Sequence, residues 1–395
     1  MDWSVYIRLS LMMFLQFAVW GAWSPVLAAR LLGPLKMSGK QTGWIYGTIY
    51  LGCIISPLIA GQIADRWIAT QWFLAGAHLA GGALLLMAAG RRKFTGLLAV
   101  MGLYALAFAP TLALVNSLMF SHLKDPAKEA FGVMVWGVVA WVLVGWALAL
   151  WRRFKGSGEG GDCLILAGVL SLFLGVYCFF LPHTPPPGSP DDALPFVKAL
   201  RMLNEPDFRV FMLVSFVLAT QLQFYFLGTA QFLVDIGVEG RNLPAIMTIA
   251  QVAQVIATTF MAFYGAHVLA AIGFRWTLAA GVLMWLAMYL VFALMHPRWL
   301  VIAAQALHGL AYAFFIAVGF LYVEQAAPKD IRGSAQALYT VALFGFGFFL
   351  GTQFTGFVMD RFKTGEGKFR WRPIYLVPCV LAAACAAVLA VLFHG

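Results

Sequence analysis

Long and almost uninterrupted apolar runs dominate the chain, and short polar clusters separate them. Residues 97–120 form such a run, whereas 91–93 and 151–153 are clusters of the separating kind. A transmembrane helix needs about 20 mostly apolar residues, whereas a barrel strand alternates apolar and polar positions over about ten. The runs here are longer than a strand and apolar all round, so the pattern predicts an all-α membrane protein.

Splitting the chain at glycines, prolines and charge clusters predicts twelve membrane-spanning helices. They cover residues 5–31, 41–63, 71–90, 95–120, 130–151, 162–181, 208–233, 243–267, 274–295, 298–323, 334–359 and 373–393. The longest polar stretch, 182–207, holds three consecutive prolines and is interpreted as a connector. We therefore expect an N-terminal six-helix bundle (1–181), a linker (182–207) and a C-terminal six-helix bundle (208–395). Transporters with this layout bind substrate between their two halves.

The composition restricts the class of function. Hydrophobic residues make up 62% of the chain and charged residues 11%, which is too little charge to cover a soluble protein of 395 residues. The net charge of +10 is explained by basic loops beside lipid headgroups, because no nucleic-acid-binding motif accompanies it. The spans contain no Ser/His/Asp set, HExxH motif or metal-spaced histidine cluster, and the chain has no Walker motif. We expect no enzyme, no cofactor and no metal.

Two simple counts bear on redox state and orientation. The five cysteines lie in or beside apolar runs without a CxxC pair, which indicates buried thiols rather than disulfides.

Twelve spans place both termini on one side of the membrane. Counting Lys and Arg in the loops then favours an external N-terminus, because basic residues concentrate in cytoplasmic loops.

Particular motifs point to a family. Residues 61–67 read Gly-Gln-Ile-Ala-Asp-Arg-Trp, which resembles the G-x-x-x-D-R loop between the second and third helices of the major facilitator superfamily. Four further segments narrow the resemblance: 14–23 (FLQFAVWGAW), 110–116 (PTLALVN), 136–137 (WG), and 323–324 (VE) with 331–336 (IRGSAQ). Together they resemble the nucleoside:proton symporter family of bacterial inner membranes along nearly the whole chain.

The resemblance implies the major facilitator fold of two six-helix halves, cytoplasmic termini, a cytoplasmic linker and proton-driven import of nucleosides. It takes precedence over the charge count, because the cytoplasmic motif and the linker define orientation more directly. The expected location is the bacterial inner membrane. The expected partners are a nucleoside-like small molecule, protons and the lipid bilayer, with no nucleic acid, for a protein that acts as a monomer.

The chain departs from the family pattern at charged positions. The resemblance implies Arg, Glu and Asp where this chain has Met134, Gln254 and Ala313. Val138 and Phe226 also replace polar family residues. These neutral replacements leave open passive facilitation in place of symport. They also leave open transport of a different substrate, a sugar-like or amphipathic compound, on the same fold.

Amides and aromatic rings within the spans are the candidate substrate contacts. Amides donate and accept hydrogen bonds, so they can recognise a base edge or a sugar hydroxyl. Aromatic rings can stack on a base, a contact worth about 1–3 kcal/mol in single-strand binders. The candidates are Gln16, Trp20, Asn116, Trp136, Trp141, Gln223, Phe226, Gln251, Gln254, His308 and Tyr312. Alternatively, the amides bond neighbouring helices, and most of the 14 tryptophans anchor the protein at the membrane interface.

A few ionisable residues complete the hypothesis. His308 is the expected proton carrier, because histidine titrates near neutral pH, although a neutral imidazole bonded to substrate or helix is the alternative. Asp65 and Arg66 are assigned to conformational control, where they would stabilise one access state. Glu324 is expected to pair with a basic loop residue. A more specific hypothesis is that this pair is a salt bridge that gates the transporter.

Overall fold

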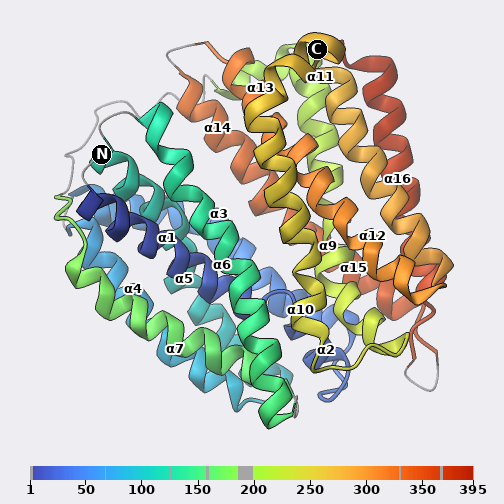
Figure 1. The fold of residues 1–395 in the computed structure, drawn as a ribbon, viewed down its shortest axis with the longest axis horizontal. Coiled ribbons are helices and arrows are strands. Elements are labelled where there is room, and N and C mark those ends of the chain that lie inside the picture. The colour runs from blue at the N-terminus through green and yellow to red at the C-terminus, as the bar shows by residue number, and fades with distance from the viewer. Residues whose placement is uncertain are drawn as a thin grey trace. The chain divides into compact units, whose positions relative to one another are not determined.

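The computed structural model describes residues 3–66, 68–123, 126–156, 160–185, 199–328, 331–364 and 368–394. Within these ranges, the side chains at 56–66, 126–128, 131, 332–334 and 337 are not described. The described chain is almost entirely helical, with a single bridge between Lys363 and Phe369 in place of any strand (Figure 1). Its contacts define two compact units, each treated by itself below. Unit 1 comprises Met1–Ser189 with Leu233–Thr248, and unit 2 comprises Pro190–Phe232 with Ile249–Gly395.

The helices of unit 1 are α1 (Trp3–Trp23), α2 (Leu27–Leu32), α3 (Gly39–Arg66), α4 (Thr70–Ala89), α5 (Phe94–His122), α6 (Pro126–Lys155), α7 (Asp162–Tyr177), η1 (Cys178–Phe180) and α10 (Leu243–Met247). Those of unit 2 are η2 (Met202–Asn204), α9 (Pro206–Asp235, whose last three residues group with unit 1), α11 (Ile249–Leu294), α12 (Arg298–Ala311), η3 (Tyr312–Ala317), α13 (Val318–Ala326), α14 (Arg332–Thr340), η5 (Val341–Gly347), α15 (Phe348–Arg361) and α16 (Trp371–Leu392).

The described helices agree with the predicted number of spans. Ten segments are long and apolar enough to cross a membrane. One of them, Leu243–Leu294, is divided by Gly273, whose φ of 70° lies in the left-handed region that glycine tolerates. This break falls in the predicted gap at 268–273. With the 28-residue α3, which is not among the ten, the structure is consistent with twelve spans.

The boundaries differ from the sequence prediction in places. The predicted span 5–31 is two helices, because Pro25 lacks an N–H and disfavours a helical residue before it, so α1 ends at Trp23. The spans 298–323 and 334–359 each contain a π-helical turn, η3 and η5, which a 3.6-residue period does not signal. Most of the predicted linker, residues 186–198, lies outside the described residues.

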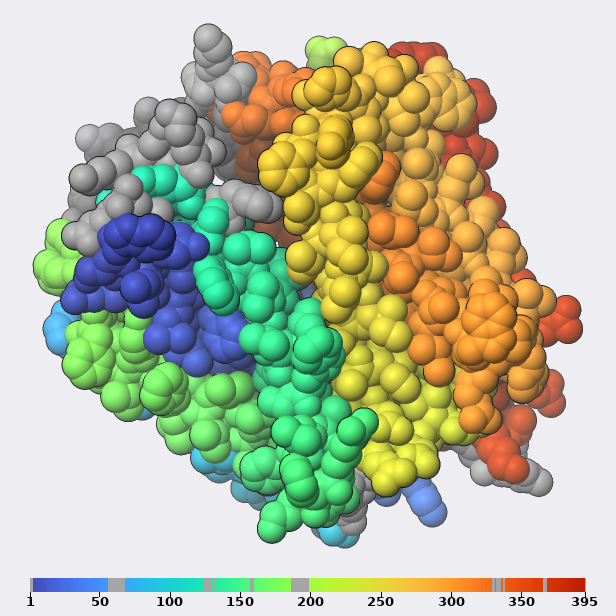
Figure 2. All heavy atoms as spheres, viewed as in Figure 1, coloured from blue at the N-terminus to red at the C-terminus, as the bar shows by residue number. Residues whose placement is uncertain are grey.

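Glycines allow unusually close helix contacts in unit 2. Gly347 and Gly351 lie four residues apart, a spacing that lets helices approach closely, and a Cβ on Gly351 would lie 2.7 Å from Cα of Thr220 in α9. Helices α11 and α12 lie side by side in Figure 1, and in Figure 2 their side chains meet without a visible gap. At this contact a Cβ on Gly309 would overlap the carbonyl oxygen of Ala250.

We predict that Gly309→Ala destabilises the protein, because the new methyl group meets backbone that cannot yield. Overpacking of this kind costs about 1–3 kcal/mol. Gly102→Ala is the matched control, since a Cβ there meets nothing within 4 Å; it should be neutral or stabilising by up to about 1 kcal/mol. Thermal unfolding of the purified variants in detergent makes the comparison. Equal melting temperatures for the two variants would show that α11 and α12 do not pack at Gly309.

Candidate substrate and coupling site

A buried polar network joins four helices of unit 1. Gln16 of α1 donates from Nε2 to the Thr111 hydroxyl of α5 at 2.7 Å, and Thr111 donates onward to the Phe108 carbonyl at 2.6 Å. The Gln16 oxygen lies 2.8 Å from Nε2 of His78 in α4. On the other side of that ring, Nδ1 lies 3.3 Å from Oγ of Ser171 in α7, which donates to the His78 carbonyl at 2.9 Å.

This network uses both ends of the Gln16 amide. Because Thr111 gives its own hydrogen to Phe108, it must accept from the Gln16 nitrogen, which leaves the Gln16 oxygen to accept from His78. Gln16 is fully buried. The structure therefore places this predicted substrate residue within the bundle interior, where it holds α1, α4 and α5 together through paired polar groups.

Aromatic rings lie beside the network. Trp20 contacts Trp141 of α6 edge-on at 5.8 Å and Phe108 at 6.3 Å. Gly21 permits the Trp141 contact, because a Cβ there would lie 3.1 Å from the indole ring. Within the described residues, the indole Nε1 of Trp20 has no hydrogen-bond partner. The predicted residues Trp20 and Trp141 are thus brought together, with ring faces and one N–H donor that a planar ligand could use.

Two other predicted residues of unit 1 have different partners. Asn116 donates to the Leu112 carbonyl of its own helix at 3.0 Å. Trp136 donates to the Tyr6 hydroxyl at 3.3 Å, and its side chain is exposed.

In unit 2, His308 of α12 lies among three aromatic side chains. Tyr225 of α9 stacks on the imidazole with ring centroids 4.0 Å apart and an interplanar angle of 13°. Phe226 meets the ring edge-on at 5.8 Å. Trp285 of α11 donates from its indole nitrogen to Nδ1 of His308 at 3.3 Å. His308 is buried, so these contacts determine the orientation of its ring.

The Trp285 contact also determines the tautomer of His308. An indole nitrogen can only donate, so Nδ1 must accept and the neutral imidazole carries its hydrogen on Nε2. Within the described residues, Nε2 of His308 makes no hydrogen bond, whereas Nε2 of His78 donates to Gln16. His308 therefore presents an N–H donor that is free for a ligand.

The remaining predicted residues of unit 2 are amides and a tyrosine near α12. Gln223 is fully buried, and neither end of its amide has a partner in the described part of the chain. The backbone nitrogen of Gln254 lies against Gly309, next to His308, and Gln251 precedes Gln254 by one helical turn. Tyr312 opens the π-helical turn η3, an irregularity that is often found at functional sites.

The sequence prediction missed Tyr225 and Trp285. Tyr225 also donates to Gln305 at 3.3 Å. Gln221, Tyr225 and Thr229 share one face of α9 at a spacing of four residues, and this spacing was the available signal. No local pattern distinguished Trp285 from the other tryptophans.

The residues assigned to conformational control are described in part. The side chains of Asp65 and Arg66 lie outside the described residues. Glu324 accepts a hydrogen bond from Gln336 of α14 at 3.3 Å, and Gln336 also donates to the Phe320 carbonyl at 2.9 Å. Among the described residues, no group of three or more His, Cys, Asp or Glu side chains could hold a metal ion.

Comparisons with known proteins agree with this architecture. YegT of Escherichia coli (strain K12), provisionally named a nucleoside transporter, is 29% identical over 405 residues, covering 98% of this chain and 93% of YegT. The xanthosine permease of the same organism is 28% identical over 413 residues, covering 99% and 95%. The crystal structure of the nucleoside transporter NupG superposes with a TM-score of 0.87 at 23% identity over both whole chains, which confirms the fold.

The superposition identifies the fold as the major facilitator fold, and the described helices are long and apolar enough for a multi-pass membrane protein. The family model described as "Nucleoside H+ symporter" matches residues 3–395. The chain therefore belongs to the nucleoside H+ symporter family.

Proposed function

We propose that this transporter moves nucleosides together with protons across the bacterial inner membrane by alternating access. Membership of the nucleoside H+ symporter family and the printed functions of its relatives support the substrate class. The observation that carries the proposal is His308, a buried imidazole with an unused N–H, stacked on Tyr225 and beside Phe226. Polar donors set among aromatic rings are what a heterocyclic base requires of its site.

The chemistry of the site suggests a role for each group. In unit 2, Nε2 of His308 would donate to a carbonyl oxygen or ring nitrogen of the base. Gln223, Gln251 and Gln254 would bind the remaining base or ribose groups, because an amide can both donate and accept. Gln223, like Gln221, is a buried amide without partners among the described residues, and such an amide loses its hydration without compensation. Taken by itself, unit 1 offers the ring faces of Trp20 and Trp141, on which a base could stack.

Proton coupling at His308 follows from its contact with Trp285. A proton that binds the neutral ring must add at Nδ1, the atom that accepts the Trp285 N–H. Imidazolium cannot accept a hydrogen bond, so protonation would break this link between α11 and α12. His308 would in this way convert proton binding into a change in helix packing, without the acidic residues that the family resemblance implies at 254 and 313.

Orientation and assembly belong to the same proposal. The motif at 61–67 and the position of the linker favour cytoplasmic termini, against the count of basic loop residues. Because each of the two units provides a polar and aromatic cluster, one chain would suffice for transport, so we propose that the protein acts as a monomer.

We expect purified protein in proteoliposomes to take up labelled uridine or adenosine, and an inward proton gradient to accelerate the uptake. Empty liposomes and a protonophore provide the controls. If the rate of uptake is the same with and without the proton gradient, the protein is a passive facilitator. If folded protein takes up neither compound, the nucleoside assignment is wrong.

We predict that His308→Gln abolishes stimulation by the proton gradient but keeps exchange of nucleoside across the membrane. The glutamine oxygen can still accept from Trp285, and its amide can still donate to substrate, but the side chain binds no proton. Counterflow should stay within about threefold of wild type, less than the roughly tenfold loss that corresponds to 1.4 kcal/mol of binding energy.

His267→Gln is the matched control for that variant, because His267 is an exposed histidine of the same unit. It should keep full stimulation by the gradient. If the proton gradient still stimulates uptake by His308→Gln, His308 is not the coupling residue. The assignment of nucleosides as substrates would be unaffected by that result.

A further inference from the structure

The connection between α9 and α11 groups with unit 1, although both of its ends continue into helices of unit 2. This segment, Leu233–Thr248, comprises the last residues of α9, a turn and the short helix α10. We call it the strap. Because its two ends are covalently continuous with α9 and α11, any movement of those helices relative to unit 1 must pull on it.

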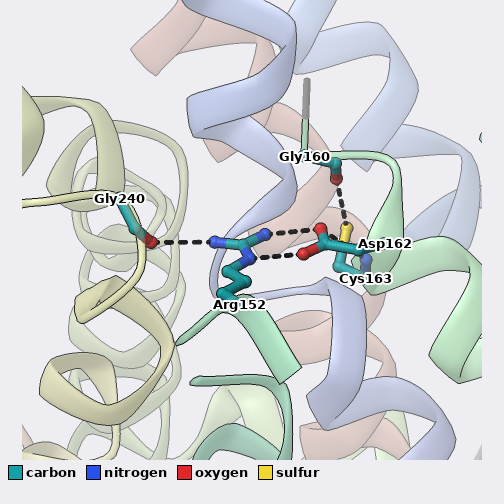
Figure 3. A network of polar contacts seen from close by, with 5 residues as sticks. All are labelled: Arg152, Gly160, Asp162, Cys163 and Gly240. Carbon is teal, nitrogen blue, oxygen red and sulfur yellow. Dashed lines mark hydrogen bonds and ion pairs between the residues drawn. The ribbon is translucent and has the colours of Figure 1, made fainter. Parts of the chain in front are cut away.

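An arginine at the end of α6 holds the turn of the strap. Arg152 forms a bidentate pair with Asp162, the first residue of α7, at 2.6 and 2.7 Å (Figure 3). Its remaining terminal nitrogen donates to the Gly240 carbonyl of the strap at 3.2 Å. The Arg152 side chain is only 4% exposed, and Asp162 is further fixed by the backbone N–H of Cys163 at 2.9 Å. The guanidinium is therefore held rigidly, with one donor aimed at the strap.

A second contact lies about two turns earlier along α6. Trp146 donates from its indole nitrogen to the Thr248 hydroxyl at 3.0 Å. Beside it, Gly145 lets α10 approach so closely that a Cβ at position 145 would lie 3.0 Å from the Pro244 carbonyl and overlap the Thr248 methyl group. The two contacts hold the turn and the end of the strap against the same helix.

The surroundings of the Arg152 contact are polar and open. A pocket of about 330 Å³ lies there, lined by Arg152, Arg153, Gly156, Glu239, Gly240 and Arg241. Within the strap, Glu239 pairs with Arg241, and both side chains are exposed. The hydrogen bond from Arg152 to the Gly240 carbonyl lies in this polar region, and water can replace such a bond when it breaks, which an apolar core would not allow.

We propose that the strap is a latch that holds the adjoining ends of α9 and α11 at α6. The bonds Arg152–Gly240 and Trp146–Thr248 hold it shut, and both break in every cycle when α9 and α11 move relative to α6. Asp162 positions Arg152 and stays bound to it throughout, so the donor is ready when the strap returns. This inference rests on the proposed function, because it supposes that the protein transports by alternating access.

A reversible disulfide tests the latch. In the double variant Gly145→Cys with Thr248→Cys, the short distance between these positions should allow a disulfide to form on oxidation. We expect oxidation to reduce nucleoside uptake at least tenfold and a reducing agent to restore it, with each single variant insensitive to oxidation. Cross-linked protein that transports at the rate of its reduced form would overturn the latch. If reduced and wild-type proteins both transport nothing, the proposed function has failed instead.

A labelling experiment tests the latch without requiring transport and without a substitution at Gly145. Thr248→Cys places a thiol at a position that is 5% exposed, and a membrane-impermeant maleimide should reach it only when the strap lifts. Adding Arg152→Gln should accelerate labelling at least fivefold. Arg153→Gln is the matched control, because Arg153 is the exposed neighbour with no recorded partner in the described residues, and it should leave the rate unchanged. Equal labelling rates in the two backgrounds would overturn the proposal.

Discussion

The structure depends on one constraint: a polar side chain inside a membrane-embedded helix bundle must find its partner within the protein. Lipid supplies no hydrogen bonds, so an unpaired group there is costly. In unit 1 the buried amide of Gln16 meets it through His78 and Thr111, and Ser171 bonds the His78 carbonyl, so that these groups join α1, α4, α5 and α7. In unit 2 it is met in part, since Trp285 satisfies one nitrogen of His308 and leaves the other available. The unused Nε2–H of His308 is the donor on which the proposed substrate contact in unit 2 rests.

This contrast assigns different roles to two buried histidines that composition and sequence position do not separate. His78 has neighbours at both ring nitrogens, whereas His308 keeps a donor. The stack on Tyr225 and the bond from Trp285 also mean that protonation of His308 changes a contact between helices. The strap, which continues into α9 and α11, is bonded to α6 through Arg152. As proposed, a proton-sensitive contact and a latch would together provide what alternating access requires.

Much of the fold could be predicted from the sequence, and less of the site. The apolar runs predict the spans because lipid requires apolar side chains on a helix that crosses the membrane. The break in α11 could be predicted because glycine, here Gly273, is a common helix-breaking residue. The placement of Gln16 could not be predicted, since its partners Thr111 and His78 are 95 and 62 residues away. Trp285 was missed because the residues of an all-apolar helix do not reveal which face is internal. The strap was missed for the same reason as Gln16: its carbonyl partner for Arg152 is 88 residues distant.

Proton exchange on nucleoside binding tests the central role of His308 most directly. Isothermal titration of purified protein with uridine or adenosine, in buffers of different ionisation enthalpy, counts the protons bound with each nucleoside. We expect net proton uptake on nucleoside binding in wild-type protein and none in His308→Gln, with nucleoside still bound by both. Binding without proton exchange in wild type, or the same exchange in the variant, would contradict it.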